Sequence, residues 1–328
     1  MTLPADVMGC PVYTDLISLG AQEYTVVTLG RFDGVHRGHQ ALLRETVELA
    51  CSSTEGRAIA ITLWPPPEWV LRVHDPRGLL TTLIDRLALM ASTGVDGLVV
   101  LTFDQNFSQQ SPREFLTRLR DELGMGVFMT GPNARIGKDG AGNPAVLRSL
   151  SSDLKVDYRE IGWHGRPQLN RSSAIRTALV QGNIGLVNEG LGRTYSMAGV
   201  VVRGEGEGRK IGFPTANVTY PTWLQIPGDG VYAGVAMIDE GPGLRRAAIS
   251  VGVRPTYGGA DRVVEAHLSD YDDDLYGHDL RLFFVNRIRG QVAFDSVDDL
   301  GEEIERDVDR VRLQACPPLH DLAPFVDG

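Results

Sequence analysis

The chain has 328 residues, a formal net charge of −10 and 42% hydrophobic residues, so it is long enough for two domains that each bury a core. The acidic balance argues against a general nucleic-acid-binding protein, although a locally basic pocket can still hold a small phosphorylated ligand. No run approaches the roughly 18 apolar residues of a membrane span, the first residues lack the pattern of a signal peptide, and the cysteines are widely separated. We therefore expect a cytoplasmic protein that binds small molecules, has no nucleic-acid or membrane partner, and is a monomer or a weak homo-oligomer.

The first half of the chain alternates strand patterns with helical patterns. Strands are expected at 24–29, 57–63, 97–103 and 126–131, and helices at 38–50, 83–92 and 111–123. Ser111 and Glu114 have the spacing of a capping box, with Pro112 at the first helical position. Strands that alternate with helices predict an α/β domain with a doubly wound parallel sheet.

The second half, from about Arg193, consists of short β-rich runs separated by glycine, proline and aspartate. These runs are 198–206, 230–239, 245–253, 263–270 and 280–290. Their spacing predicts an antiparallel barrel or sandwich, and residues 296–315 follow with helical spacing and acidic residues in the first turn. A glycine-rich stretch at 181–193 indicates the boundary, so we predict domains at 1–189 and 190–328.

The stretch TLGRFDGVHRGHQALL, residues 28–43, follows the first expected strand and opens the first expected helix. Ligands of open α/β sheets bind at the carboxyl ends of strands, and phosphates favour helix N-termini. His36 and His39 are three residues apart, so both side chains can face the same side of the first turn and hydrogen-bond to phosphate oxygens. The residues alone leave open a pair of structural histidines, or a metal pair that lacks its other ligands.

GRFDGVHRGHQALL resembles the nucleotidyltransferase signature of the bacterial bifunctional riboflavin kinase/FAD synthetases, and the segments 101–116, 131–143 and 171–183 follow in the order of that family. The resemblance implies that His36 and His39 contact ATP phosphates and stabilise the transition state. It also implies ATP or phosphate contacts from Gly30, Phe32, Gly34, Asn133, Ser172, Ser173 and Arg176. A guanidinium suits this role because it binds phosphate in a bidentate fork.

The stretch GEGEGRKIGFPTANV, residues 204–218, has neither the spacing of a Walker loop nor that of a dinucleotide fingerprint. By generic chemistry it predicts a glycine-rich hairpin followed by a turn that contains proline. Thr215 and Asn217 are two residues apart, so on an extended segment their side chains face the same side. Glu265, considered alone, is an ordinary carboxylate at a strand edge.

GRKIGFPTAN, residues 208–217, resembles the riboflavin kinase signature almost letter for letter, and matching segments continue to residue 307. The resemblance implies a six-stranded Greek-key barrel with a C-terminal helix. It implies that Thr215 and Asn217 hold Mg²⁺ and ATP, that Glu265 is the catalytic base for the ribityl hydroxyl, and that Arg289 lies near the flavin. Further ATP contacts are implied for Gly204, Gly206, Gly208, Lys210, Gly212 and Pro214. The acidic segment 269–277 lacks the spacing of a calcium loop and is expected to form a solvated turn near the flavin-binding side.

Together these resemblances predict a bifunctional enzyme that phosphorylates riboflavin to FMN with ATP and Mg²⁺, and then transfers an adenylyl group from ATP to FMN, giving FAD and pyrophosphate. Two departures motivate an alternative. Pro66 replaces the histidine of the family's TFxPHP segment, and Ala134 and Ile136 replace two phenylalanines. These positions line or support the flavin and nucleotide pockets of relatives. In the alternative, the N-terminal half is degenerate or retuned to another nucleotide or flavin analogue. A non-catalytic flavin sensor is a third possibility, against which Thr215, Asn217 and Glu265 argue.

Overall fold

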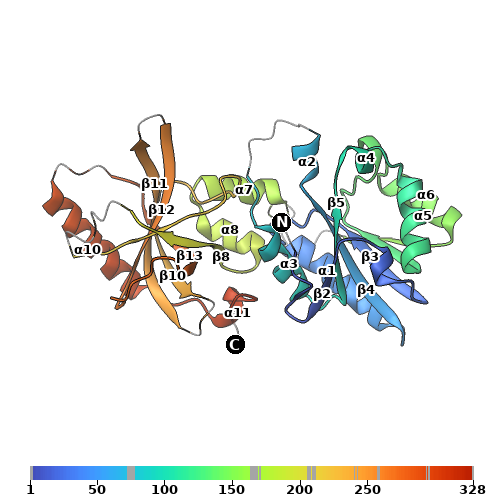
Figure 1. The fold of residues 1–328 in the computed structure, drawn as a ribbon, viewed down its shortest axis with the longest axis horizontal. Coiled ribbons are helices and arrows are strands. Elements are labelled where there is room, and N and C mark those ends of the chain that lie inside the picture. The colour runs from blue at the N-terminus through green and yellow to red at the C-terminus, as the bar shows by residue number, and fades with distance from the viewer. Residues whose placement is uncertain are drawn as a thin grey trace. The chain divides into compact units, whose positions relative to one another are not determined.

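The protein is described from a computed structural model, in residues 3–71, 78–162, 169, 171–204, 208, 212–239, 241, 243–256, 259–292, 294 and 296–326. The chain divides into two compact units. The first unit consists of Met1–Pro76 and Thr81–Arg171, and the second of Arg77–Leu80 and Ser172–Gly328 (Figure 1).

A seven-stranded sheet forms the centre of the first unit, in the order β1-β2-β5-β4-β3-β6-β7. The strands are β1 (Asp6–Val7), β2 (Cys10–Tyr13), β3 (Tyr24–Leu29), β4 (Gly56–Trp64), β5 (Gly97–Thr102), β6 (Met125–Thr130) and β7 (Asp157–Glu160). β1 pairs with β2 antiparallel, and the other neighbouring pairs are parallel. The chain leaves β3 towards β4 and leaves β6 towards β7, so a topological switch point lies at the adjacent carboxyl ends of β3 and β6.

Helices cover both faces of this sheet (Figure 1). On one face, α1 (Arg37–Cys51) contacts β3 and β4, and α3 (Leu83–Ala91) contacts β5. On the other, α5 (Pro112–Leu123) and α6 (Pro144–Leu154) pack their apolar side chains against alternate residues of β3, β4 and β5. The capping box of Ser111 and Glu114 starts α5, as expected. Shorter helices are η1 (Ile17–Leu19), α2 (Pro67–Val70), α4 (Gln105–Ser108) and η2 (Lys138–Gly140). The predicted doubly wound α/β architecture is confirmed.

The second unit contains a closed antiparallel barrel in the order β10-β11-β12-β9-β8-β13. Its strands are β8 (Tyr195–Val202), β9 (Ala216–Val218), β10 (Gly230–Ile238), β11 (Leu244–Thr256), β12 (Gly259–Leu268) and β13 (Asp279–Arg289). Alternate residues of these strands fill one apolar core. The C-terminal helix α10 (Val297–Leu313) begins at a Ser296 cap and packs on β10 and β11, and α11 (Leu319–Leu322) follows. The expected barrel with a C-terminal helix is confirmed.

Two helices that precede the barrel share its core. α7 (Ser172–Val180) and α8 (Ile184–Leu191) contribute Ile175, Leu179, Ile184 and Val187 to the cluster that fills the barrel. The compact units therefore divide before Ser172, whereas the composition of the sequence indicates a boundary at residue 190. The domain boundary at residue 190 remains a prediction, and it can be tested by asking whether residues 190–328 fold alone.

Candidate active sites

The turn between β3 and α1 has an unusual backbone. Phe32 and Val35 have positive φ angles of 49° and 37°, and both side chains are buried. A β-branched residue at positive φ is strained, and such strain concentrates at functional sites. Gly30 is needed for a different reason, because a Cβ there would lie 2.9 Å from Cζ of Phe32. This turn lies at the topological switch point, where open α/β sheets bind their ligands.

The two histidines of the turn lie together at the N-terminus of α1. His36 is the N-cap residue, and its Nδ1 accepts a hydrogen bond from the backbone N–H of His39 at 3.3 Å. The rings stack with centroids 3.7 Å apart and an interplanar angle of 16°. The Phe32 ring meets the His39 ring edge-on, with centroids 5.2 Å apart. The structure therefore brings His36, His39, Phe32 and Gly34 to one helix N-terminus, which favours anions.

His39 is held in its uncharged form. Burial, together with the charges of His36, Arg86 and Arg31, lowers the pKa of His39 well below the usual histidine value of 6.5. Its Nδ1 is buried, and within the described ranges no group hydrogen-bonds to it. A neutral imidazole at this position can offer one N–H to a ligand without adding a full positive charge to the site.

The other residues predicted for this site fall into two groups. Asn133 is exposed in the turn that follows β6, and β6 pairs with β3, so the two turns leave the same edge of the sheet. Ser172, Ser173 and Arg176 lie on α7 in the second unit. Ser172 and Arg176 are one helical turn apart, and Arg176 is buried. Their role at the adenylyl site remains a prediction.

The departures from the family pattern lie in packed regions of the first unit. Ile136 is 7% exposed and belongs to the apolar cluster between the sheet and α5, and Ala134 packs against the same cluster. Backbone hydrogen bonds join Ile136 to Gly142 in both directions, at 3.1 and 2.8 Å. Pro66 is buried and precedes α2 as its N-cap residue. The aliphatic side chains of Ala134 and Ile136 thus pack into the core beside the 131–143 loop.

In the second unit, Glu265 and Asn217 are direct cross-strand partners on β12 and β9. Their neighbours Val264, Ala266, Ala216 and Val218 are buried in the barrel core, so alternation directs Glu265 and Asn217 to its outer surface. Directly opposed residues have Cβ atoms about 4.5–5.5 Å apart. Thr215 immediately precedes β9, and Ser250 faces Glu265 from β11. One outer face therefore carries a carboxylate, an amide and two hydroxyls.

Two glycines of the 204–212 stretch approach neighbouring groups closely. A Cβ at Gly204 would lie 2.2 Å from Nδ2 of Asn217, and one at Gly208 would lie 2.3 Å from the carbonyl oxygen of Phe213. Gly212 has a φ of 85°, which favours glycine. Next to it, the ring Nδ1 of His267 lies 2.9 Å from the carbonyl oxygen of Pro214 and anchors the residue before Thr215. Gly206 and Lys210 lie outside the described residues.

A pocket of about 310 Å³ lies beside Thr215. Buried apolar residues of the barrel, including Ala266 and Leu268, form one part of its lining, and the acidic segment from Tyr271 to Tyr276 forms another. Its size is at the lower end of the range of small-molecule sites. The acidic turn predicted from the sequence thus lines a pocket together with Thr215.

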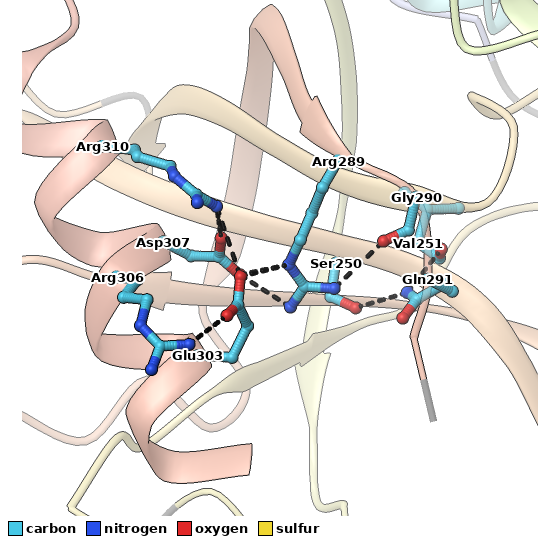
Figure 2. A network of polar contacts seen from close by, with 9 residues as sticks. All are labelled: Ser250, Val251, Arg289, Gly290, Gln291, Glu303, Arg306, Asp307 and Arg310. Atoms are coloured by element: carbon cyan, nitrogen blue, oxygen red, sulfur yellow. Dashed lines mark hydrogen bonds and ion pairs between the residues drawn. The ribbon is translucent and has the colours of Figure 1, made fainter. Parts of the chain in front are cut away.

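Arg289 lies in a network of ion pairs between β13 and α10 (Figure 2). Its Nε and Nη2 lie 2.9 and 2.7 Å from Oδ2 of Asp307, and its Nε lies 3.5 Å from Glu303. Its Nη1 donates to the carbonyl oxygen of Gly290 at 3.0 Å. Arg310 reaches the second oxygen of Asp307 at 3.0 Å. All three guanidinium nitrogens are engaged within the protein, so a flavin contact remains a prediction.

Oxygen ligands suit the expected metal. The hydroxyl of Thr215 and the amide oxygen of Asn217 are hard donors of the kind that Mg²⁺ accepts beside phosphate oxygens and water. Within the described part of the chain, no three His, Cys, Asp or Glu side chains lie together as a metal cage. The donor set therefore fits a cation held jointly with a nucleotide.

The sequence motifs assign no role to four residues that contact these two stretches: Asp33, Thr81, Arg86 and His267. Asp33 lies inside the GRFDGVHRGH stretch and could have been included from it. Thr81 and Arg86 are far from that stretch in sequence, and His267 lies two residues after Glu265 with no motif of its own. Only the fold brings them to the sites.

Comparison with known proteins relates both units to one family. A family model described as FAD synthetase matches residues 19–173, and one described as riboflavin kinase matches residues 191–314. The chain is 33% identical over 300 residues to the bifunctional riboflavin kinase/FMN adenylyltransferase of Escherichia coli K12, covering 89% of this chain and 93% of that protein. It is 31% identical over 300 residues to the Bacillus subtilis enzyme of the same name, covering 87% and 91%.

A solved structure also matches along most of the chain. A crystal structure of a macrolide-efflux protein from Streptococcus pneumoniae matches with a TM-score of 0.83 and 27% identity, covering 93% of this chain and 99% of that one. None of the helices in the described ranges combines the length and apolar character of a membrane span. On its sequence identity and coverage, the chain belongs to the bifunctional riboflavin kinase/FMN adenylyltransferase family.

Proposed function

We propose that the chain makes flavin cofactors in two steps: it phosphorylates riboflavin to FMN in the second unit, and it transfers an adenylyl group from ATP to FMN in the first. The observation that carries the proposal is the presence of one set of polar groups in each unit. One is the stacked His36–His39 pair at the N-terminus of α1, and the other is the outer barrel face with Thr215, Asn217 and Glu265. Relatives that match along both units carry the names of both activities.

In the kinase step, the ribityl hydroxyl oxygen bonds to the γ-phosphorus of ATP while the bond to the bridging oxygen breaks, so that ADP leaves. Glu265 accepts the hydroxyl proton, because it is a carboxylate on the same face as the phosphate ligands. Thr215 and Asn217 would hold Mg²⁺, which would neutralise phosphate charge. The pocket beside Thr215 has apolar walls that suit a nucleobase. Gly204, Gly206, Gly208, Lys210, Gly212 and Pro214 belong to the segment that covers the phosphates.

In the adenylyl step, a phosphate oxygen of FMN attacks the α-phosphorus of ATP and pyrophosphate leaves. His36 and His39 hydrogen-bond to the oxygens on which negative charge builds, aided by the positive end of the α1 dipole. Gly30, Phe32, Gly34 and Asn133 shape the site at the switch point. Ser172, Ser173 and Arg176 supply further phosphate contacts in this proposal.

A kinase with a degenerate first unit is not favoured. The strained turn and the stacked histidines are present, and Ala134 and Ile136 lie in a well-packed region. Relatives with both activities in their names match over both units. A cytoplasmic location is part of the proposal, because ATP is abundant there.

Product identity tests the proposal. The purified chain is incubated with riboflavin, ATP and Mg²⁺, and FMN, FAD, ADP and pyrophosphate are followed by chromatography and mass spectrometry. We expect FMN first and FAD later, with one ADP per FMN and one pyrophosphate per FAD. FMN without FAD, with ATP or any other nucleoside triphosphate, would contradict the adenylyl step and leave the kinase step standing. Parallel reactions with Mn²⁺ or without metal test the choice of Mg²⁺.

A further inference from the structure

The first unit buries an ion pair beside the two histidines. Arg86 on α3 and Asp33 in the β3–α1 turn each have side chains that are 2% exposed, and Nη2 of Arg86 lies 3.8 Å from Oδ1 of Asp33. Nε and Nη2 of Arg86 are buried and have no hydrogen-bond partner among the residues that the structure describes. Burying a guanidinium this way is costly, and apolar residues of similar volume often stabilise a core as well or better. A role in packing alone therefore explains the pair poorly.

Asp33 anchors the strained turn. Oδ1 of Asp33 accepts from the backbone N–H of Thr81 at 3.3 Å and from its hydroxyl at 3.5 Å. The Thr81 hydroxyl in turn accepts from the backbone N–H of Gly34 at 3.2 Å. These bonds hold the turn between Phe32 and Val35, the two non-glycine residues of this turn with positive φ. Strain of about 1–3 kcal/mol per residue persists only where the surroundings impose it.

Arg86 is itself fixed from another side. Its Cζ lies 5.8 Å from the centroid of the Trp64 ring, at the carboxyl end of β4. The charge of Arg86 is also among those that lower the pKa of His39, after burial and the charge of His36. The guanidinium thus lies between the ring of Trp64 and Asp33 in the strained turn, and its charge acts on His39.

We propose that Arg86 is a positioning residue of adenylyl transfer: through Asp33 and Thr81 it holds the 30–36 turn in the conformation that aims His36 and His39 at the phosphates. The inference rests on the proposed adenylyl activity of the first unit. Arg86 acts through Asp33, so it governs how well the histidines stabilise the transition state more than how tightly ATP binds.

The test uses the full chain and three substitutions. Arg86→Met removes the charge, Arg86→Lys keeps it, and Thr81→Val removes the hydroxyl that links Asp33 to Gly34. We expect Arg86→Met and Thr81→Val to lower kcat for FAD formation about 10²-fold, as a misplacement of about 1 Å does, with a much smaller change in KM for ATP. Arg86→Lys should recover part of the loss. Arg118→Met, a partly exposed arginine of the same unit paired with Glu122, is the matched control and should have wild-type kcat.

Each variant is assayed well below its own melting temperature, so that incomplete folding does not lower kcat. FMN formation in the same reaction gives the amount of enzyme, because the kinase residues lie in the second unit. Wild-type kcat in Arg86→Met, or a loss seen only where the variant unfolds, would show a purely structural ion pair and overturn the inference. A wild-type chain that makes no FAD would instead overturn the proposed function, and the inference with it.

Discussion

His36 has two roles, and an alanine substitution would remove both at once. Its Nδ1 caps α1 by accepting from the backbone of His39, and its ring is part of the proposed phosphate site. Loss of an N-cap costs about 1 kcal/mol, whereas loss of a donor at developing charge costs about 10²–10³-fold in rate. His36→Asn separates the two, because asparagine caps a helix well and lacks the imidazole.

We expect His36→Ala, His36→Asn and His39→Ala each to lower FAD formation about 10²–10³-fold while FMN formation stays close to wild type. The reason is that Thr215, Asn217 and Glu265 lie in the other unit. FMN and FAD are measured separately in one reaction by chromatography. FAD formation at the wild-type rate by His36→Asn would reduce His36 to a helix cap.

Glu265 is the proposed catalytic base on the outer barrel face that also carries Thr215 and Asn217. Glu265→Gln keeps the shape and removes the proton acceptor, so we expect kcat for FMN formation to fall about 10²–10⁴-fold with riboflavin binding nearly unchanged. Turnover is measured by chromatography, and binding by the change in flavin fluorescence. Glu302→Gln, an exposed carboxylate on α10, is the control. Unchanged turnover in Glu265→Gln would remove this residue as the base.

At the scale of elements, the network in Figure 2 shows how α10 is held to the barrel. Asp307 is 3% exposed and depends on Arg289 and Arg310 for compensation of its charge, whereas Arg306 lies on the exposed side of the helix. Removal of one partner from a buried pair leaves an uncompensated charge, which costs about 3–5 kcal/mol. An exposed pair contributes about 0–1 kcal/mol.

We therefore expect Arg289→Met to lower the stability of the second unit by several kcal/mol, and Arg306→Met to change it little. Urea unfolding followed by circular dichroism measures both. The predicted flavin contact of Arg289 would have a different signature, namely a raised KM for riboflavin with little loss of stability. Equal stabilities of Arg289→Met and Arg306→Met would contradict the structural role of the pair.

At the scale of the whole molecule, the placement of α7 and α8 decides which fragment folds. Their side chains Ile175, Leu179, Ile184 and Val187 complete the barrel core, and each buried side chain of this size contributes about 1.5–3 kcal/mol. We expect residues 172–328 to be soluble and to convert riboflavin to FMN. Residues 190–328 should melt at a lower temperature or aggregate.

Leu179→Ala within residues 172–328 tests whether the packing of α7 stabilises the barrel. We expect it to lower the free energy of unfolding by about 2–5 kcal/mol. Scanning calorimetry compares residues 172–328, the Leu179→Ala variant of that fragment, and residues 190–328. If residues 190–328 melt at the same temperature as 172–328, the two helices are accessory, and the boundary that the composition indicates would be the folding boundary.

The sequence by itself determined the doubly wound sheet, the β-rich character of the second half and the two motif stretches, and it left a barrel or a sandwich open for that half. Alternating strand and helix periods predict the doubly wound sheet, and a spacing of two residues predicts that Thr215 and Asn217 share a face, because these patterns are local. The helix cap at Ser111 is equally local, and the structure contains it. Family resemblance assigned roles to Glu265 and Arg289, which periodicity alone does not.

Only the tertiary structure decided which distant groups meet. Arg86 and Thr81 reach Asp33 across about fifty residues, and Arg289 meets carboxylates of α10 that lie beyond a turn. The sequence also did not predict that α7 and α8 pack in the barrel core, because a glycine-rich stretch after a helix resembles a linker in composition. The physical reason is common to these cases: side-chain packing and ion pairing act through space, and a linear pattern reports only the neighbours along the chain.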